Sequence, residues 1–357
     1  METEGIVFVV GAGASKEFKL PVGAELKDQI ASLCDIRFDG FGSKLEAGKP
    51  QIVETLRILA KSDQSPRATI NPYLHAAWSI RDNMHLAPSI DNFLDTHKDD
   101  RNIVLMGKLC ILDAILEAEK KSSLFHDRKP FPLGINFQGS ANTWLGRLFT
   151  VLAAQRDFGS FLSALRCIQF ISFNYDRCIQ QYFCFASESY FGLDSAQVEE
   201  VLEAIQIQYV YGSVGEYKWD KNNLAFGQPF YGQRLLDAVD NIKTFTEGVD
   251  LEVSELIFSR IDGCRSINFL GFGFLELNMK ALLADKQPIA SSIRATGKGL
   301  SADDRNLLNG DLERMFALSK DASGVSYFGT NLDAFYSGTC SEFITEFGRR
   351  LLRELDA

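Results

Sequence analysis

The chain has few histidines and lacks paired cysteines. Its 7 cysteines include no Cys-x-x-Cys pair, and its 4 histidines show no metal-ligand spacing. Zinc sites in proteins take paired cysteine or histidine ligands at short spacings. We therefore expect no metal site and no zinc ribbon, and we interpret the cysteines as reduced thiols in the core of a cytoplasmic protein. The cysteines are Cys34, Cys110, Cys167, Cys178, Cys184, Cys264 and Cys340.

Basic charge and long apolar runs are also scarce. Lysine and arginine together number 37 against 47 aspartate and glutamate residues, which gives a formal net charge of -10. An acidic chain repels phosphates, so direct binding of nucleic acid is not expected. No apolar run is long enough to span a bilayer, so no membrane association is expected. With 357 residues, of which 46% are hydrophobic, the chain can bury a large core in one domain or in two intimate ones.

A strand and a glycine turn open the sequence. The run Ile6–Val10 is β-branched and aromatic, which predicts a strand buried on both faces. Gly11 and Gly13 follow directly, and Pro21 suits the first turn of the next helix. These features predict an anion cradle for a pyrophosphate, in which Gly13→Val abolishes nucleotide binding and leaves the fold largely intact. Lys16 stands where the dinucleotide-binding pattern has its third glycine, so a tight turn without a ligand is the alternative.

Helical patterns and short strands occupy separate parts of the remaining chain. Residues from about 46 to 156 show amphipathic periodicity without a clear strand, which predicts a helical lobe. Strands are predicted at 167–173, 205–211, 266–270 and 325–328, and a last helix at 341–355. Strands alternating with helices predict an α/β fold with a parallel sheet. We expect residues 1–40 and 160–357 to form the sheet domain and residues 41–159 to form the helical lobe.

Glycine, amide and acidic residues follow the predicted strands. Ligands of such sheets bind at the carboxyl ends of the strands, so these segments are expected to meet at one edge. The segments are Gly11–Ser15, Phe173–Arg177, Tyr211–Val214, and Gly271–Phe274 with Asn278. Several such turns, each placed directly after a predicted strand, indicate a dinucleotide site.

This ordered set resembles the sirtuin-like family, and in particular its bacterial members that cleave NAD in anti-phage defence. The matching segments are Gly11–Ser15 with Pro21, Ser89–Leu94, Ser172–Asp176, Tyr211–Ser213 and Leu270–Phe274. The resemblance implies a Rossmann-like sheet and a helical lobe, with NAD bound as the substrate in the cleft between them. The defence branch also lacks the cysteine pairs of the zinc-bearing deacetylases. Pro21 is followed here by Val-Gly-Ala, where those deacetylases have an acid-Phe-Arg run.

The resemblance also implies a role for each matching residue. The pyrophosphate would be held by Gly11, Ala12, Gly13 and Ser15, and Pro21 and Asp91 would belong to the same cofactor-binding site. Asn174 would position a water or a ribose hydroxyl, and Asp176 would contact the carboxamide or the ribose. The adenosine half would be lined by Ser213, Gly271 and Phe272.

Helix capping is the alternative for three of these polar residues. Asn174 and Asp176 fit an Asx turn at the start of a helix near Tyr175. Asp91 fits the cap of the helix that contains Phe93.

Tyr211 departs from the family pattern, which has a histidine before the Gly-Ser pair. That histidine is the usual general base, whereas a phenol with a pKa of about 10 is a poor base at neutral pH. Either Tyr211 acts in catalysis by orienting a hydroxyl, or the protein is a weakened subunit that binds NAD or ADP-ribose. His97 is a further candidate for the cleft, with an exposed helix end as its alternative. An oxidoreductase is disfavoured, because no acidic residue follows a second strand at the usual distance.

Partner proteins follow from the resemblance alone. It implies a homo-oligomer and a defence partner such as an ATPase, a nuclease or an Argonaute-like protein.

Overall fold

A six-stranded parallel sheet forms the centre of the protein. The computed structural model describes residues 5–40, 42, 44–62, 69–126, 135–154, 156–219, 226–248, 251–283, 287–290, 292–318 and 335–356. The strand order is β10-β8-β6-β1-β4-β5, and every neighbouring pair is parallel. The strands are β1 (Ile6–Val10), β4 (Ile168–Ser172), β5 (Gln206–Tyr209), β6 (Ser266–Leu270), β8 (Ile293–Thr296) and β10 (Phe335–Tyr336). This is an α/β fold, consistent with a Rossmann-like architecture.

The direction of strand addition reverses at β1. The chain adds β4 and β5 on one side of β1, and then adds β6, β8 and β10 on the other side. The last residue of β1, Val10, pairs with Ser172 of β4 and with Leu270 of β6, so these three strands end level. A reversal of this kind opens a crevice outside the carboxyl ends of the strands, where ligands bind.

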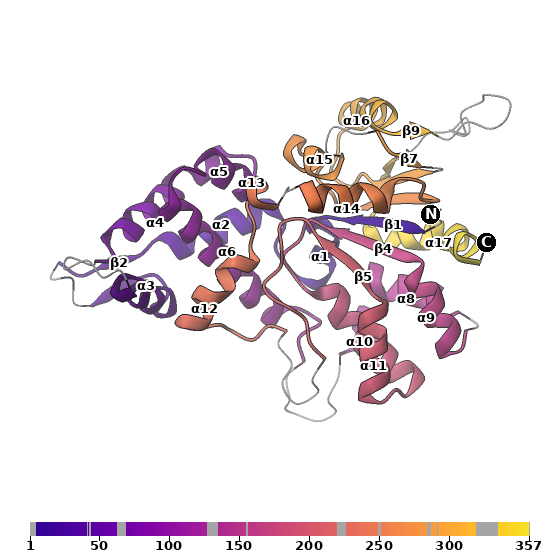
Figure 1. The fold of residues 1–357 in the computed structure, drawn as a ribbon, viewed down its shortest axis with the longest axis horizontal. Helices are drawn as coiled ribbons and strands as arrows, with labels where there is room; N and C mark the ends of the chain where they lie inside the picture. Colours follow the sequence, from indigo (N-terminus) through magenta and orange to yellow (C-terminus); the bar gives the residue numbers. More distant parts are fainter. Residues whose placement is uncertain are drawn as a thin grey trace.

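Both faces of the sheet are covered, as Figure 1 shows. Val7 and Val9 of β1 pack into one hydrophobic cluster, and Phe8 and Val10 pack into the other. This alternation across two cores confirms that β1 is buried on both faces. The first core includes α14 (Leu251–Ile261) and α15 (Glu276–Leu283), with α16 (Ala302–Met315) beyond them. The second includes α8 (Trp144–Ala153), α9 (Phe158–Arg166), α10 (Cys178–Phe191), α11 (Ser195–Ala204) and α17 (Cys340–Asp356).

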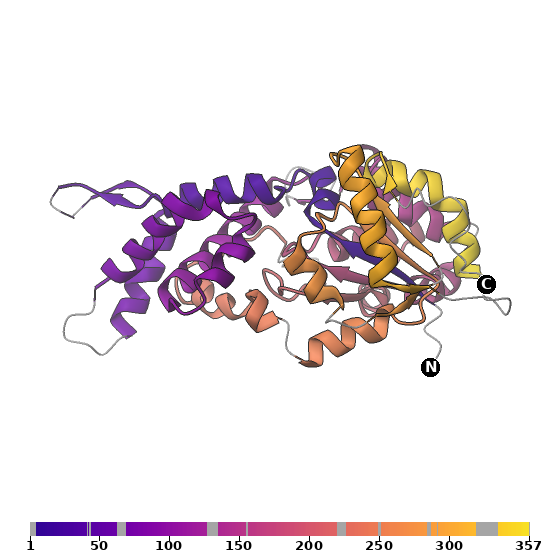
Figure 2. The same ribbon diagram turned by 90° about the horizontal axis from the view of Figure 1, so that it is seen from above.

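A helical lobe extends from the sheet at the left of Figures 1 and 2. It contains α2 (Gly23–Cys34), α3 (Pro50–Ser62), α4 (Asn71–Asn83), α5 (Ile90–Thr96) and α6 (Arg101–Lys121), and the hairpin of β2 (Arg37–Phe38) and β3 (Leu45–Ala47). Two later helices, α12 (Gln233–Ala238) and α13 (Phe245–Gly248), pack against α3, α5 and α6. By contrast, α8 packs against α17 on the sheet. The lobe therefore takes elements from two parts of the chain, and part of the 41–159 range covers the sheet.

The remaining elements are short: α1 (Ala12–Ser15), η1 (Lys16–Phe18), η2 (Met84–Leu86), α7 (Phe137–Ser140), η3 (Val239–Asn241), and the pair β7 (Ile289–Ala290) and β9 (Ala317–Leu318). The predicted strand at 325–328 lies outside the described residues. In the described ranges, no helix combines the length and the apolar character needed to cross a membrane.

The sequence pattern missed β8 because its buried face is partly polar. Arg294 and Thr296 are buried there, and Arg294 pairs with Glu354 of α17. The guanidinium of Arg294 also lies 5.5 Å from the ring centre of Phe347. A charged residue interrupts the apolar run that predicts a buried strand, and its partners from distant parts of the chain make its burial tolerable.

Candidate functional site

A cavity of about 620 Å³ lies at the carboxyl ends of β1, β4, β6 and β8. Its volume is within the range of about 300–1,000 Å³ that is common for small-molecule sites. Most of the residues predicted for the site line it: Gly11, Ala12, Gly13, Ser15, Pro21, Asp91, Asn174, Asp176, Gly271 and Phe272. Tyr211 and Ser213 are not among the lining residues. The cavity therefore combines the loops after β1, β4 and β6 with the lobe helix α5.

A chain of hydrogen bonds joins the polar residues after β1 and β4. The side-chain amide of Asn174 donates to the carbonyl oxygen of Gly11 at 3.0 Å and to the Ser15 hydroxyl at 2.9 Å. The Ser15 hydroxyl donates in turn to Oδ2 of Asp176 at 2.7 Å. All three side chains are buried. Because both amide hydrogens of Asn174 are used, its side-chain oxygen is the atom left to accept from a bound molecule.

Asp176 also forms a turn just before the helix that follows β4. Its Oδ1 accepts from the backbone N–H of Cys178 at 3.1 Å, and α10 starts at Cys178. The predicted Asx turn is therefore present at Asp176, but Arg177 is the N-cap of the helix, which starts later than predicted. It is wrong for Asn174, whose amide bonds to the loop after β1. Burial raises the pKa of Asp176, and the hydrogen bond from Ser15 acts in the opposite direction.

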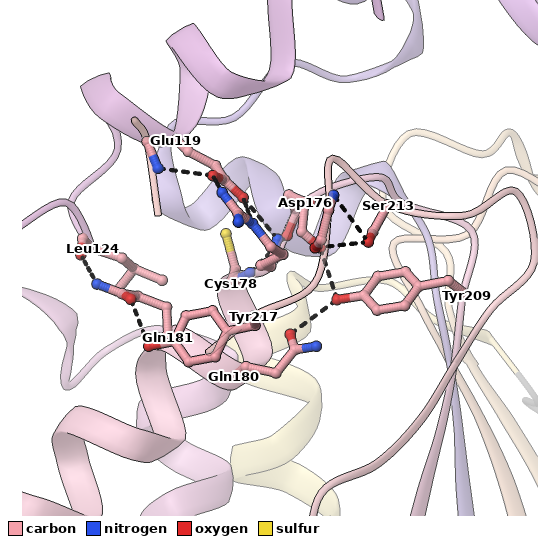
Figure 3. A network of polar contacts seen from close by, with 12 residues as sticks. Glu119, Leu124, Asp176, Cys178, Gln180, Gln181, Tyr209, Ser213 and Tyr217 are labelled. Atoms are coloured by element: carbon pink, nitrogen blue, oxygen red, sulfur yellow. Dashed lines mark hydrogen bonds and ion pairs between the residues drawn. The ribbon is translucent and has the colours of Figure 1, made fainter. Parts of the chain in front are cut away.

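A buried ion pair between Arg177 and Glu119 supports the loop after β4. Figure 3 shows the Glu119 carboxylate beside Asp176. Glu119 of α6 accepts from the backbone N–H, Nε and Nη2 of Arg177 at 3.0, 3.1 and 2.5 Å. It also accepts from the backbone N–H of Gly227 at 2.9 Å. The Arg177 side chain is 1% exposed and the Glu119 side chain 0%. The pair fixes the residue next to Asp176 and ties the loop to α6 in the lobe.

The glycines after β1 pack against the loop after β6. Gly11 donates its N–H to the carbonyl of Leu270, and Gly13 donates to that of Gly271, both at 2.9 Å. Gly271 has a φ of 57°, and a β-carbon there would lie 2.1 Å from the backbone nitrogen of Ala14. These glycines are thus needed for contact between two loops, and two of the N–H groups expected to bind a pyrophosphate are already bonded.

Asp91 reaches the cavity from the lobe. The cap of α5 is Ser89, whose hydroxyl accepts from the N–H of Asn92 at 3.1 Å, so the capping interpretation of Asp91 is wrong. Asp91 instead accepts a hydrogen bond at Oδ1 from the hydroxyl of Tyr175. Burial raises the pKa of both groups. This bond joins the lobe to the loop after β4, next to Asn174.

Tyr211 lies behind the cavity wall. Its side chain is 2% exposed, and its hydroxyl donates to Oδ1 of Asn278 at 2.9 Å. Its ring packs edge-on against Phe173, with centroids 5.8 Å apart. Asn278 and Phe173 line the cavity, so Tyr211 supports two wall residues. Burial raises the pKa of Tyr211 further above that of an ordinary phenol.

Ser213 does not belong to the part of the site that contains Gly271. It follows β5, the edge strand of the sheet, and it does not line the cavity. Its hydroxyl donates to the carbonyl of Gly215 at 3.1 Å, as Figure 3 shows. The expected contact of Ser213 with the adenosine half is therefore not supported by its position.

His97 ends α5 outside the cavity. Its ring stacks on Phe93 with centroids 4.2 Å apart, and its Nδ1 lies 2.8 Å from the carbonyl oxygen of Phe93. It is not among the cavity residues, which agrees with the helix-end interpretation.

Sequence reasoning missed several charged cavity residues. Glu17 accepts the backbone N–H groups of Trp144 and Ser341 at 2.6 and 2.8 Å and joins the first turns of two helices, and burial raises its pKa. Lys298 follows β8 and was missed with that strand. No local signal marks Glu17, because both of its partners are more than 100 residues away in the chain.

Within the described ranges, no group of three or more histidine, cysteine, aspartate or glutamate residues could hold a metal ion. No protein-family model matches the chain, and a search of curated proteins finds no match.

Proposed function

We propose that the protein is a sirtuin-like NAD hydrolase of bacterial anti-phage defence. It binds NAD in the cavity and uses water to cleave the bond between nicotinamide and ribose, which releases nicotinamide and ADP-ribose. The observation that carries the proposal is the buried Asn174–Ser15–Asp176 hydrogen-bond chain at the point where β1 and β4 end. This chain lies inside a cavity of a size suited to a nucleotide.

Cleavage of NAD needs no catalytic acid at the leaving group, nicotinamide. Nicotinamide leaves the pyridinium ribose as a neutral molecule, so no acid has to protonate it. The transition state resembles an oxocarbenium ion and is stabilised by negative charge nearby. When ionised, the Asp176 carboxylate supplies that charge from a fixed position, because Ser15 and Cys178 donate to its two oxygens.

Asn174 is suited to orient the second reactant. With its amide hydrogens bonded to Gly11 and Ser15, its side-chain oxygen can accept from a water or a ribose hydroxyl. An interaction of this kind accelerates the reaction when it is stronger in the transition state than in bound NAD.

A weakened subunit that binds NAD or ADP-ribose is the second candidate. Tyr211 favours it, because this residue stands where the family has its histidine and its hydroxyl is already bonded to Asn278. In either case the proposal includes a homo-oligomer and a partner such as an ATPase, a nuclease or an Argonaute-like protein.

The deciding experiment follows nicotinamide release from NAD by the purified protein, alone and with the products of neighbouring genes. Equal amounts of nicotinamide and ADP-ribose are expected. If neither product forms under any condition but calorimetry detects ADP-ribose binding, the binding subunit replaces the hydrolase. If there is neither turnover nor binding, both candidates are wrong.

A further inference from the structure

We propose that Asp91 is the general base of the cavity and accepts the proton of the attacking water. This inference rests on the proposed NAD hydrolysis and assigns the role that Tyr211 cannot fill from behind the wall. Asp91 lines the cavity and accepts a hydrogen bond from Tyr175, the residue next to Asn174.

Both oxygens of each of the other cavity carboxylates accept a hydrogen bond from the protein. Asp176 uses one oxygen for Ser15 and the other for the N–H of Cys178. Glu17 uses one oxygen for the N–H of Trp144 and the other for that of Ser341. Asp91 accepts from the tyrosine hydroxyl at Oδ1, and its carboxylate also interacts with the Ser89 side chain and its own backbone N–H. We assign the accepting position left on Oδ2 to the water.

The position of Asp91 suits a water that is also held by Asn174. Tyr175 and Asn174 are consecutive residues, so their Cα atoms are about 3.8 Å apart. The bond to Tyr175 joins the Asp91 carboxylate, which comes from the lobe, to the side chain of the residue that follows Asn174. The two side chains line the same cavity from opposite domains.

The environment of Asp91 also favours proton transfer. Burial raises its pKa, although the hydrogen bond from Tyr175 acts in the opposite direction. A carboxylate whose pKa is moved toward neutrality is a better base at neutral pH than an ordinary one.

The proton and electron balance of the step is simple. The water oxygen forms a bond to C1′ of the ribose, and the C1′–N bond breaks with its electron pair going to nicotinamide. One water proton passes to Asp91, which later releases it to solvent. The products are ADP-ribose, neutral nicotinamide and one proton.

The competing explanation is that the bond between Asp91 and Tyr175 only fastens the lobe to the sheet. Asp91→Asn separates the two, because an asparagine oxygen still accepts from Tyr175 but the side chain takes up no proton. Tyr175→Phe does the reverse by removing the bond and keeping the carboxylate. Asp99→Asn is the matched control, since Asp99 is exposed and outside the cavity.

The test measures nicotinamide release, ADP-ribose affinity and thermal unfolding for these variants. Asp91→Asn is expected to lower kcat by about 100-fold or more, the scale of general-base catalysis. Its Kd for ADP-ribose is expected to stay within about threefold of the wild type. Tyr175→Phe should lose less activity, Asp99→Asn none, and added formate should restore part of the activity of Asp91→Ala.

Three results would overturn the assignment. If the wild type cleaves NAD and Asp91→Asn cleaves it equally well, Asp91 is not the base, while the proposed hydrolase stands. If Asp91→Asn and Tyr175→Phe lose activity and stability together and formate restores nothing, Asp91 is a fastening residue. If the wild type never cleaves NAD, the proposed function fails first and the base assignment fails with it.

Discussion

The backbone of Gly13 lies so close to that of Gly271 that a β-carbon on residue 13 would be 2.8 Å from the Cα of Gly271. Real β-carbons essentially never come that close to another heavy atom. This contact joins the loops after β1 and β6 at the reversal point of the sheet. The glycine that sequence reasoning assigned to a ligand is therefore also needed by the protein itself.

Gly13→Ala is expected to lower the free energy of unfolding by about 1–3 kcal/mol, because overpacking shifts backbone as well as side chains. Urea denaturation of wild type and variant measures the difference. Gly273→Ala is the matched control, since a β-carbon there would meet nothing within 4 Å. Equal stability of Gly13→Ala and the wild type would contradict the contact. The original expectation that Gly13→Val spares the fold is replaced by this one.

Asn174→Ala is expected to reduce NAD cleavage by about 100-fold or more and to change ADP-ribose affinity by less than about threefold. The physical reason is that its amide oxygen is assigned to the transition state, whereas most binding contacts lie elsewhere in the cavity. Product release assays and titration calorimetry give the two numbers. An equal loss of affinity and turnover would make Asn174 a binding residue only.

Tyr211→Phe is expected to lower the free energy of unfolding by about 0.5–1.5 kcal/mol, because Asn278 loses a buried hydrogen-bond donor. Turnover should fall by no more than about tenfold, since the hydroxyl supports the wall and does not line the cavity. Denaturation and nicotinamide release are measured on the same preparation. A larger loss of turnover with unchanged stability would return Tyr211 to a direct catalytic role.

Tyr211→His tests the weakened-subunit alternative. If the tyrosine abolished hydrolysis by replacing a histidine base, the substitution should raise cleavage by about 100-fold where the geometry permits. With Asp91 as the base, no such gain is expected. Nicotinamide release from the variant and from the wild type, assayed with every partner present, decides between the two.

Glu119→Gln is expected to lower the free energy of unfolding by about 3–5 kcal/mol, because it leaves the charge of Arg177 buried without its carboxylate. Chemical denaturation measures the loss. Glu216→Gln is the control, since Glu216 pairs with Lys218 on the surface, where both side chains are more than 70% exposed. If the two substitutions lowered the free energy of unfolding by similar amounts, the buried pair would contribute no more to stability than the exposed one.

The spacing of apolar residues in the sequence predicted the helices and strands that are buried mainly by apolar side chains. The strands predicted at 6–10, 167–173, 205–211 and 266–270 correspond to β1, β4, β5 and β6. The helix predicted at 341–355 is α17 (Cys340–Asp356). A strand of mainly apolar residues is buried on both faces of the sheet. A helix with apolar residues at every third or fourth position is buried on one face only. The α/β class and the edge at which polar loops gather follow from these periods alone.

The sequence by itself determined which loops carry glycine, amide and acid groups and that they follow strands. Only the tertiary structure decided which of them share a cavity, because the direction of a side chain after a strand depends on what packs around it. Tyr211 and Ser213 do not line the cavity although their motif is in order, and Asp91 bonds to Tyr175, which is 84 positions away in the chain. The polar strand β8 and the helix contacts of Glu17 likewise depend on partners far away in the sequence. A hydrogen bond that compensates for burial has no local signature when its two groups come from different elements.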